Sequence, residues 1–304
     1  MSANAVQEES PMKAIAANFS LGREVWQRFS SKLGRKGRQS PGLSLQLIEM
    51  PQPTIVSPQW VKIRSIMSGI SDLDEGMILN QDPATFGAFV SFPFVPGNEN
   101  LGIVTEVGDE ARGIEVGERV VVNPLLSCEA RQVEELCPSC TLGEPSACRN
   151  FANGILSPGL MIGSCKDTAG GWGDCFIAHK SQIRPIPQHM DSDTAILIPE
   201  FSRVIRAVLK HRPTPGDRVL VVGGGSMGLL TLKALELFGG EAKITLVVEY
   251  PFEADVARKL GYKDVIVGTA PAEAYEEIAQ IVGGSVRYPE FGHIFLEGGG
   301  RSGV

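Results

Sequence analysis

The chain has 304 residues, of which 43% are hydrophobic and 21% are charged, and its formal net charge is −7. This length exceeds that of a typical single domain, so two globular domains with full cores are expected. The negative charge argues against nucleic acid as the main partner, and no stretch of the sequence is apolar and long enough to span a bilayer.

The first half of the chain predicts a polar leader followed by an irregular all-β domain. Residues 1–11 lack the apolar run of a signal peptide and are expected to be disordered, which favours a cytoplasmic protein. Strands are predicted at 12–17, 43–50 and 60–67, the last two from alternation of apolar and polar residues. The basic stretch at 21–40 is interpreted as a solvated surface insertion. Short strands with proline and glycine turns continue to about residue 190.

Four of the six cysteines gather in a loop-like stretch of this first half. They are Cys128, Cys137, Cys140 and Cys148, and the middle two form a Cys-x-x-Cys pair. Four thiolates can complete a tetrahedral structural zinc site, which would staple a lobe with little core of its own. Unligated thiols or a redox pair are the alternatives. Cys165 and Cys175 have no histidine at ligand spacing and are interpreted as ordinary thiols.

From about residue 192 the pattern changes to alternating helices and strands. Helices are predicted at 193–198 and 203–210, with Pro213 ending the second. An apolar strand at 219–222 then leads into a glycine turn, and a helix is predicted at 229–238. Further along the chain we expect strands at 243–249, 264–267 and 293–297 and helices at 254–261 and 271–282.

The glycine turn has the spacing Gly-x-Gly-x-x-Gly, from Gly223 through Gly225 to Gly228. A strand, this turn and a helix in succession are the context that a dinucleotide fingerprint requires. Gly223 permits the tight turn, Gly225 lets a pyrophosphate approach the backbone, and Gly228 lets the helix lie close on the sheet. Ser226 and Met227 complete the turn and would offer backbone N–H groups to the phosphates. Any glycine-rich strand–helix turn of an α/β domain could look similar.

The next strand ends in an acid, Glu249, which follows Gly228 by 21 residues. An acid at this place accepts hydrogen bonds from the adenosine ribose and disfavours a 2′-phosphate, which favours NAD while leaving NADP open. A doubly wound domain normally has six strands. The sequence provides about four before the glycine-rich end that begins at Gly298. This predicts either a truncated gene product, the simpler interpretation, or an unusually short fold.

Taken together, these motifs resemble the medium-chain dehydrogenase/reductase family, in particular its zinc-containing alcohol and threonine dehydrogenase branch. The similar segments, in one order over residues 12–304, are Val61–Ile70, Pro96–Gly108, Gly117–Val122, the four cysteines, Gly170–Asp174 and Pro215–Gly223. The resemblance implies a GroES-like β domain at 12–192 with a four-cysteine lobe at 124–150. It also implies a Rossmann nucleotide domain at 193–304, here incomplete, and an active site in the cleft between the two.

The catalytic zinc ligands of that family are replaced in this chain. Where the family has a cysteine after Gly-Ile, this chain has Ser71; where it has the histidine of Gly-His-Glu, this chain has Asn98. A two-residue deletion would instead align Ser71 with the family's proton-relay hydroxyl. Glu99 and Glu200 match metal-site positions. Serine and asparagine are poor zinc ligands, so a normal catalytic zinc is not expected, although Asp72 or Asp74 could supply oxygen to a weak site.

The resemblance implies an NAD(H)-dependent oxidoreductase that acts on a small alcohol or carbonyl compound, as a homo-oligomer. Without zinc, Ser71 and Asn98 would donate hydrogen bonds to the substrate oxygen, and Glu99 or Asp72 would accept the proton. Structural roles are the alternative: Ser71 and Asp72 could cap a turn, Asn98 could satisfy backbone groups, and Glu99 and Glu200 could form salt bridges. Two alternatives remain: a catalytically inactive nucleotide-binding or structural family member, and a zinc-independent quinone or enoyl reductase, a branch that usually lacks the four cysteines.

Overall fold

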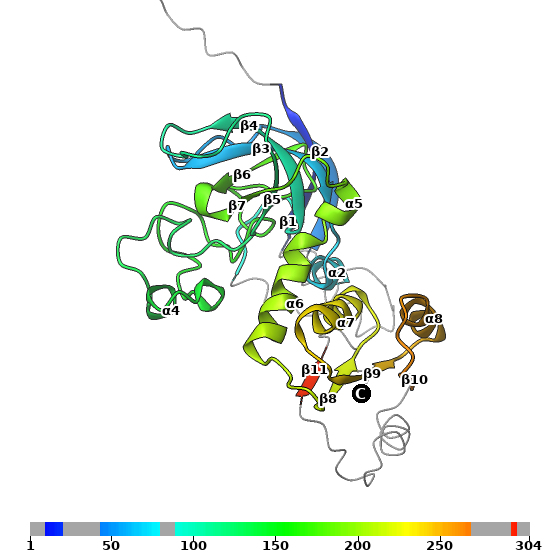
Figure 1. The fold of residues 1–304 in the computed structure, drawn as a ribbon. Helices are drawn as coiled ribbons and strands as arrows, with labels where there is room; N and C mark the ends of the chain where they lie inside the picture. Colours follow the sequence, from blue (N-terminus) through cyan, green and yellow to red (C-terminus); the bar gives the residue numbers. More distant parts are fainter. Residues whose placement is uncertain (1–9, 21–42, 80–88, 269–292, 297–304) are drawn as a thin grey trace, which may run out of the picture. The chain divides into compact units, whose positions relative to one another are not determined.

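The computed structural model describes residues 10–20, 43–79, 89–268 and 293–296. The chain divides into two compact units, Met1–Leu197 and Ile198–Val304, which are coloured blue to green and green to red in Figure 1. The predicted leader up to residue 9, the basic stretch, the helix at 271–282 and the turn from Gly298 lie outside the described residues.

The first unit is built on antiparallel strands. Its larger sheet has the order β6-β3-β4-β5-β7, and a separate pair, β1-β2, runs in register from Met12 opposite Met50 to Phe19 opposite Leu43. The bounds are β1 Met12–Phe19, β2 Leu43–Met50, β3 Trp60–Ser68, β4 Asn100–Val107, β5 Arg119–Val122, β6 Cys175–His179 and β7 Ile183–Pro185. The alternating sequence at 43–50 therefore forms the predicted strand.

The core of this unit is formed by β3, β6 and the segments that pack on them. Trp60, Ile63 and Phe176 are fully buried, and apolar residues of the long connection between β5 and β6 join the same cluster. Among the described residues of this unit, short helices interrupt the strands: α2 Asp72–Leu79, α4 Pro138–Thr141, η1 Pro145–Ala147, η2 Lys180–Gln182 and α5 Ser192–Ala195. The connection that carries α4 and η1 is the cysteine lobe.

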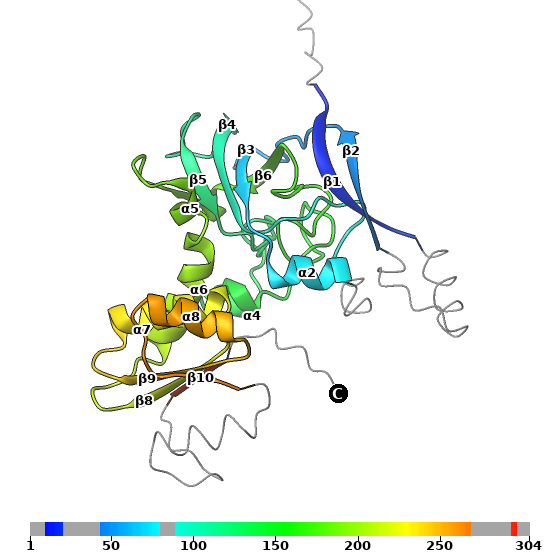
Figure 2. The same ribbon diagram turned by 90° about the vertical axis from the view of Figure 1, so that its right-hand side faces the viewer.

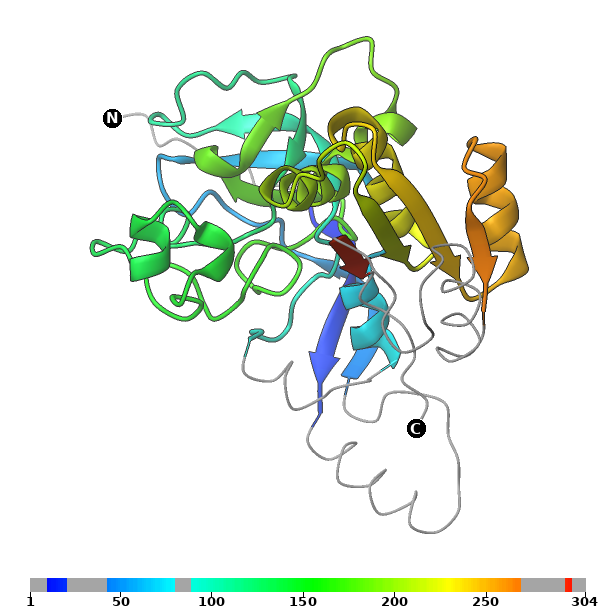
Figure 3. The same cartoon turned by 60° about the horizontal axis from the view of Figure 1, so that its bottom comes forward.

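The second unit is a parallel sheet with the strand order β10-β9-β8-β11. Its elements are α6 Ile198–Lys210, β8 Arg218–Val222, α7 Ser226–Phe238, β9 Lys243–Val248, α8 Pro251–Lys259, β10 Val265–Val267 and β11 His293–Leu296. Figure 2 shows α7 and α8 on one side of these strands, and Figure 3 shows the strands side by side. In sequence order this is 3-2-1-4, the first part of a doubly wound sheet.

Both faces of the central strand β8 are buried, as a parallel sheet requires. Val219 and Val221 pack with Leu232 and Leu235 of α7 in one cluster, whereas Leu220 packs with Val247 and Ile266 in another. The predicted α/β class, an antiparallel β unit followed by a partial doubly wound sheet, is confirmed.

The helices of this unit begin earlier than their sequence patterns predicted. The helix expected at 203–210 starts at Ile198, and the helix expected at 254–261 spans 251–259. In both cases a proline, Pro199 or Pro251, lies in the first turn. A proline is tolerated there because the first N–H groups of a helix have no intrahelical partner.

Candidate functional site

The glycine turn leads from β8 directly into the N-terminus of α7. Gly223 has a φ of +112°, a conformation that favours glycine, and its N–H donates to the Val247 carbonyl over 2.8 Å. Gly225 is the N-cap residue of α7 and has no side chain with which to cap that end. Gly228 is buried on the first turn. The turn therefore directs the positive end of α7 and its first backbone N–H groups, those of Ser226 and Met227 included, toward an anion.

The predicted acid lies at the same edge of the sheet. Because β8 and β9 are parallel neighbours, the glycine turn and Glu249 both follow the carboxyl ends of their strands. Glu249 is exposed directly after Val248, the last residue of β9. On the other side of β8 lies β11, the strand that reverses the order of the sheet. In open α/β sheets, ligands bind at this reversal point, outside the carboxyl ends of the strands.

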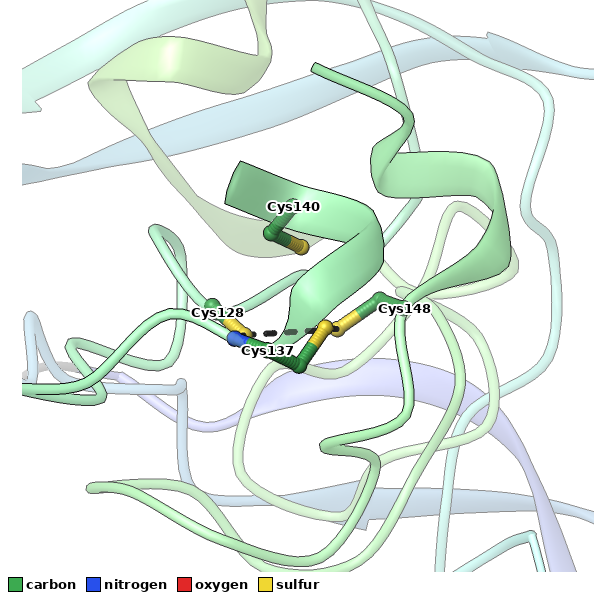
Figure 4. Close-up of side chains that lie close together, drawn as sticks. All are labelled: Cys128, Cys137, Cys140 and Cys148. Atoms are coloured by element: carbon green, nitrogen blue, oxygen red, sulfur yellow. Dashed lines mark hydrogen bonds between the residues drawn. The ribbon is translucent and has the colours of Figure 1, made fainter. Parts of the chain in front are cut away.

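The four predicted metal ligands come together in the lobe between β5 and β6. The Sγ atoms of Cys128, Cys137, Cys140 and Cys148 all lie within 4.8 Å of one another, and Figure 4 shows them converging from α4 and its flanking loops. Among the residues that the structure describes, no other group of three or more His, Cys, Asp or Glu side chains is gathered in this way. The chemistry and number of the donors fit one tetrahedral zinc ion.

Backbone and side-chain N–H groups surround these sulfurs. Cys128 Sγ accepts from the backbone N of Cys137 (3.4 Å) and from Asn150 Nδ2 (3.1 Å), and Cys148 Sγ accepts from the backbone N of Asn150 (3.4 Å). The backbone N–H of Arg149 donates to Cys137 Sγ over 3.5 Å, and it is the main cause that lowers the pKa of Cys137 to about 6. Such outer hydrogen bonds orient metal ligands and favour thiolates.

A buried arginine that sequence reasoning missed holds the lobe together. Arg131 is fully buried, and its guanidinium donates to five backbone carbonyls, those of Leu126, Asn153, Leu156, Ser157 and Gly159, at 2.5 to 3.2 Å. Burial lowers the pKa of this guanidinium, which nevertheless stays protonated at neutral pH. These charged hydrogen bonds tie Arg131 to the backbone on both sides of the four cysteines.

Ser71 and Asn98, two of the predicted catalytic residues, lie together with Asp74 in a buried polar cluster. Asn98 Nδ2 donates to Ser71 Oγ over 2.8 Å, and Ser71 Oγ donates to Asp74 Oδ2 over 2.7 Å. The backbone N–H of Ser71 also reaches Asp74 Oδ2 (2.9 Å), and that of Gly97 reaches Asp74 Oδ1 (3.3 Å). Burial raises the pKa of the Asp74 carboxyl.

The carboxylate of this cluster belongs to Asp74, which was not among the predicted catalytic residues. Asp72 is the first residue of α2. The spacing Ser71-x-x-Asp74 is that of a capping box, and the Asp74 N–H donates to Ser71 Oγ over 3.3 Å while the Ser71 N–H donates back. That sequence signature, rather than any catalytic motif, identifies Asp74.

Glu99 and Glu200 are the two remaining predicted site residues. Glu99 is buried beside Asn98, and its carboxylate lies against Gly69, where a Cβ would collide with it. Glu200 is buried in the first turn of α6, in the second unit, and pairs with Arg203 over 3.2 Å.

Comparison with known proteins shows what the chain is similar to. Residues 57–188 match the alcohol dehydrogenase GroES-like domain. This match, together with the relatives named next, supports the predicted resemblance to the medium-chain dehydrogenase/reductase family, in its zinc-type alcohol dehydrogenase-like branch. The chain is 26% identical over 197 residues to D-arabinitol dehydrogenase 1 of Uromyces fabae, a match that covers 64% of this chain and 51% of that protein. It is 27% identical over 248 residues to L-threonine 3-dehydrogenase of Rhizobium etli, a match that covers 82% of this chain and 65% of that protein.

Solved structures of the family share the fold. Galactitol-1-phosphate dehydrogenase of Escherichia coli superimposes with a TM-score of 0.68 and 19% identity, over 95% of this chain and 69% of that one. The chain thus spans about half to two thirds of the length of the curated relatives it matches. Within the described ranges, no helix has the length and hydropathy needed to cross a membrane.

The polar cluster does not fit the catalytic zinc of this branch. Ser71 offers a hydroxyl and Asn98 an amide, and both are weak zinc donors. Asp74 is the one strong donor, but its carboxylate is already engaged by the Ser71 hydroxyl and by the backbone N–H groups of Ser71 and Gly97. The cluster uses its hydrogen-bonding capacity internally, and no zinc-dependent step is assigned to it.

Proposed function

We propose that this protein is an NAD(P)(H)-dependent oxidoreductase that transfers hydride between a nicotinamide and a small alcohol or carbonyl compound, without a normal catalytic zinc. The observation that carries the proposal is the β8–α7 turn. Its glycines, the N-terminus of α7 and the acid after β9 lie at one edge of a sheet ordered 3-2-1-4. Two relatives are dehydrogenases of hydroxyl-bearing small molecules, arabinitol and threonine.

The dinucleotide, when bound, supplies the hydride chemistry, and the chain supplies binding, orientation and proton transfer. The polar cluster provides a proton route that needs no metal. A substrate hydroxyl would displace the long contact of the Asp74 N–H with Ser71 Oγ (3.3 Å) and give its proton to that oxygen, while Ser71 passes its own proton to the Asp74 carboxylate. Asn98 holds Ser71 in place through its hydrogen bond of 2.8 Å. The raised pKa of Asp74 makes this carboxylate a better proton acceptor than an ordinary aspartate.

Fluorescence titration with NADH tests the cofactor site through Gly225→Val. Gly225 has a φ of −73° and a ψ of −167°, an extended conformation that valine also adopts, so the substitution adds bulk without backbone strain. We expect NADH binding to weaken by at least about tenfold, because the side chain fills the approach of the pyrophosphate. An unchanged thermal unfolding profile is the control for folding. Unaltered NADH binding by the variant would contradict the proposal.

A second candidate is a family member that binds nucleotide or serves a structural role without catalysis. The observation in its favour is that Ser71, Asp74 and Asn98 satisfy one another and cap α2. Incubation of the full chain with NAD and a panel of sugar alcohols, vicinal diols and threonine distinguishes the two. NADH formation supports the oxidoreductase, whereas NADH binding without turnover of any compound supports the second candidate.

The third interpretation, a zinc-independent quinone or enoyl reductase, is less favoured because the chain brings the four cysteines together. The proposal also includes a cytoplasmic location and a homo-oligomeric state, with a small molecule rather than nucleic acid as the partner. The net charge of −7 is in keeping with this choice of partner.

A further inference from the structure

A second glutamate lies beside the glycine turn. Glu253 is in the first turn of α8, and its Oε2 accepts hydrogen bonds from the backbone N–H groups of Glu249 (3.1 Å) and Tyr250 (3.0 Å). These two bonds fix the carboxylate at the carboxyl end of β9. The side chain of Glu253 is therefore anchored at the place where the chain leaves β9, next to the exposed Glu249.

Glu253 also touches the glycine turn itself. A Cβ added to Gly224 would lie 2.7 Å from Glu253 Cβ, 2.7 Å from Val248 Cγ1 and 3.0 Å from Glu253 Cδ. Only glycine fits at this position without a shift of its neighbours. The contact places the Glu253 side chain between the turn after β8 and the turn after β9, the two segments at which the proposed dinucleotide would bind.

The charge of these two turns is wholly negative. Residues 223–227 and 249–253 contain two glutamates and neither lysine nor arginine. The nearby Arg258 is turned to other partners, because it pairs with Asp255 (3.6 Å) and donates to the Val265 carbonyl (3.4 Å). A ribose hydroxyl can donate to a carboxylate here, whereas a 2′-phosphate would meet two like charges, and these two turns contain no lysine or arginine to compensate them.

We propose that Glu253, acting together with Glu249, makes this edge of the sheet reject a 2′-phosphate, so that the chain selects NAD(H) over NADP(H). The inference rests on the proposed function, since it presumes a dinucleotide at the β8–α7 turn. It adds Glu253 as a specificity-determining residue that the position of Glu249 alone does not reveal. The two backbone hydrogen bonds hold the carboxylate at this edge of the sheet, so turning the side chain away would break both.

The test is titration of the full chain with NADH and with NADPH, read by cofactor fluorescence and by calorimetry. Glu253→Gln keeps an amide oxygen for the two backbone N–H groups and keeps the contact with Gly224, but it removes the charge. We expect the wild type to bind NADH at least about tenfold more tightly than NADPH. In Glu253→Gln, the ratio of the NADPH to the NADH dissociation constant should fall by about tenfold, because NADPH binds more tightly. Because salt screens the repulsion, the wild-type ratio should also fall at high ionic strength.

Asp255→Asn is the matched control, since it removes one charge from the same helix at an exposed position that pairs with Arg258. It should leave the ratio of the two dissociation constants unchanged. Equal binding of NADH and NADPH by the wild type, or an unchanged ratio of their dissociation constants in Glu253→Gln, would overturn the inference. Either result would still support the proposed dinucleotide site. If neither dinucleotide binds the wild type, the proposed function fails and the inference fails with it.

Discussion

The Ser71 hydroxyl donates to the Asp74 carboxylate over 2.7 Å, while the backbone N–H of each of the two residues donates to the side chain of the other. This reciprocal pair caps α2, and Asn98 Nδ2 donates a further hydrogen bond to Ser71 Oγ. The segment in which zinc-dependent relatives are expected to hold a metal is therefore held in this chain by hydrogen bonds.

The first prediction concerns the pH dependence of this cluster. A carboxyl whose pKa is raised in the folded state binds its proton more tightly there than in the unfolded chain. Its contribution to the free energy of unfolding is thus complete below the ordinary pKa of aspartate and is lost as the pH rises through the raised value. Each pKa unit corresponds to about 1.4 kcal/mol. We expect wild type to lose stability relative to Asp74→Asn as the pH rises above about 4.

Chemical denaturation of both proteins at a series of pH values measures this difference. Asp109→Asn, which removes an exposed carboxylate from the turn after β4, is the control and should give a curve parallel to that of the wild type. Parallel curves for wild type and Asp74→Asn would show that Asp74 does not titrate as described.

The second prediction concerns Arg131. Replacement by methionine keeps much of the volume but leaves five carbonyls, three of them on the buried residues Leu126, Leu156 and Gly159, without their charged donor. Hydrogen bonds to charged groups contribute about 1.5–3 kcal/mol each, and losing several should lower the free energy of unfolding by about 3 kcal/mol or more. Arg149→Met changes an arginine of the same lobe that is not fully buried and should alter stability by less than about 0.5 kcal/mol. Similar denaturation midpoints for the two variants would refute this role.

The third prediction concerns the metal of the cysteine lobe. Cys140→Ser should release the zinc and expose residues 124–150 to proteolysis, because a hydroxyl replaces one of four thiolates. Cys165→Ser changes a buried thiol outside the cluster and should retain the metal. Limited proteolysis with metal analysis follows both effects. If Cys140→Ser retains zinc and protease resistance, the lobe is not stapled by a metal.

The fourth prediction restores the missing catalytic ligands. Ser71 Oγ and Asn98 Nδ2 lie 2.8 Å apart, so the two side chains converge as ligands of one ion must. This convergence favours the alignment without a gap over the two-residue deletion. The double variant Ser71→Cys with Asn98→His, beside Asp74, should bind about one more zinc per chain than the wild type. No gain in bound zinc would favour the deletion.

Much of the fold could be predicted from the sequence, because its signals are local. Alternation marked the strand at 43–50, and the glycine spacing located the turn between β8 and α7. The Cys-x-x-Cys pair pointed to the lobe in which the four thiols meet. In each case the residues that carry the signal are close together in the chain.

The features that were missed depend on partners far apart in the sequence or on backbone atoms. Arg131 acts on carbonyls up to 28 residues away, and a carbonyl leaves no signature in the sequence. The role proposed for Glu253 depends on its contact with Gly224, and the two residues come together because β8 pairs with β9. Asp74 was the exception, since the spacing Ser71-x-x-Asp74 already contained the capping box.

The zinc content of the purified full-length chain, measured by elemental mass spectrometry, tests the central account most directly. We predict about one zinc per chain, held by the four cysteines, with none at the Ser71–Asp74–Asn98 cluster. About two zinc ions per chain would contradict the metal-free site and restore a zinc-dependent mechanism. A chain without zinc would contradict the account of the cysteine lobe.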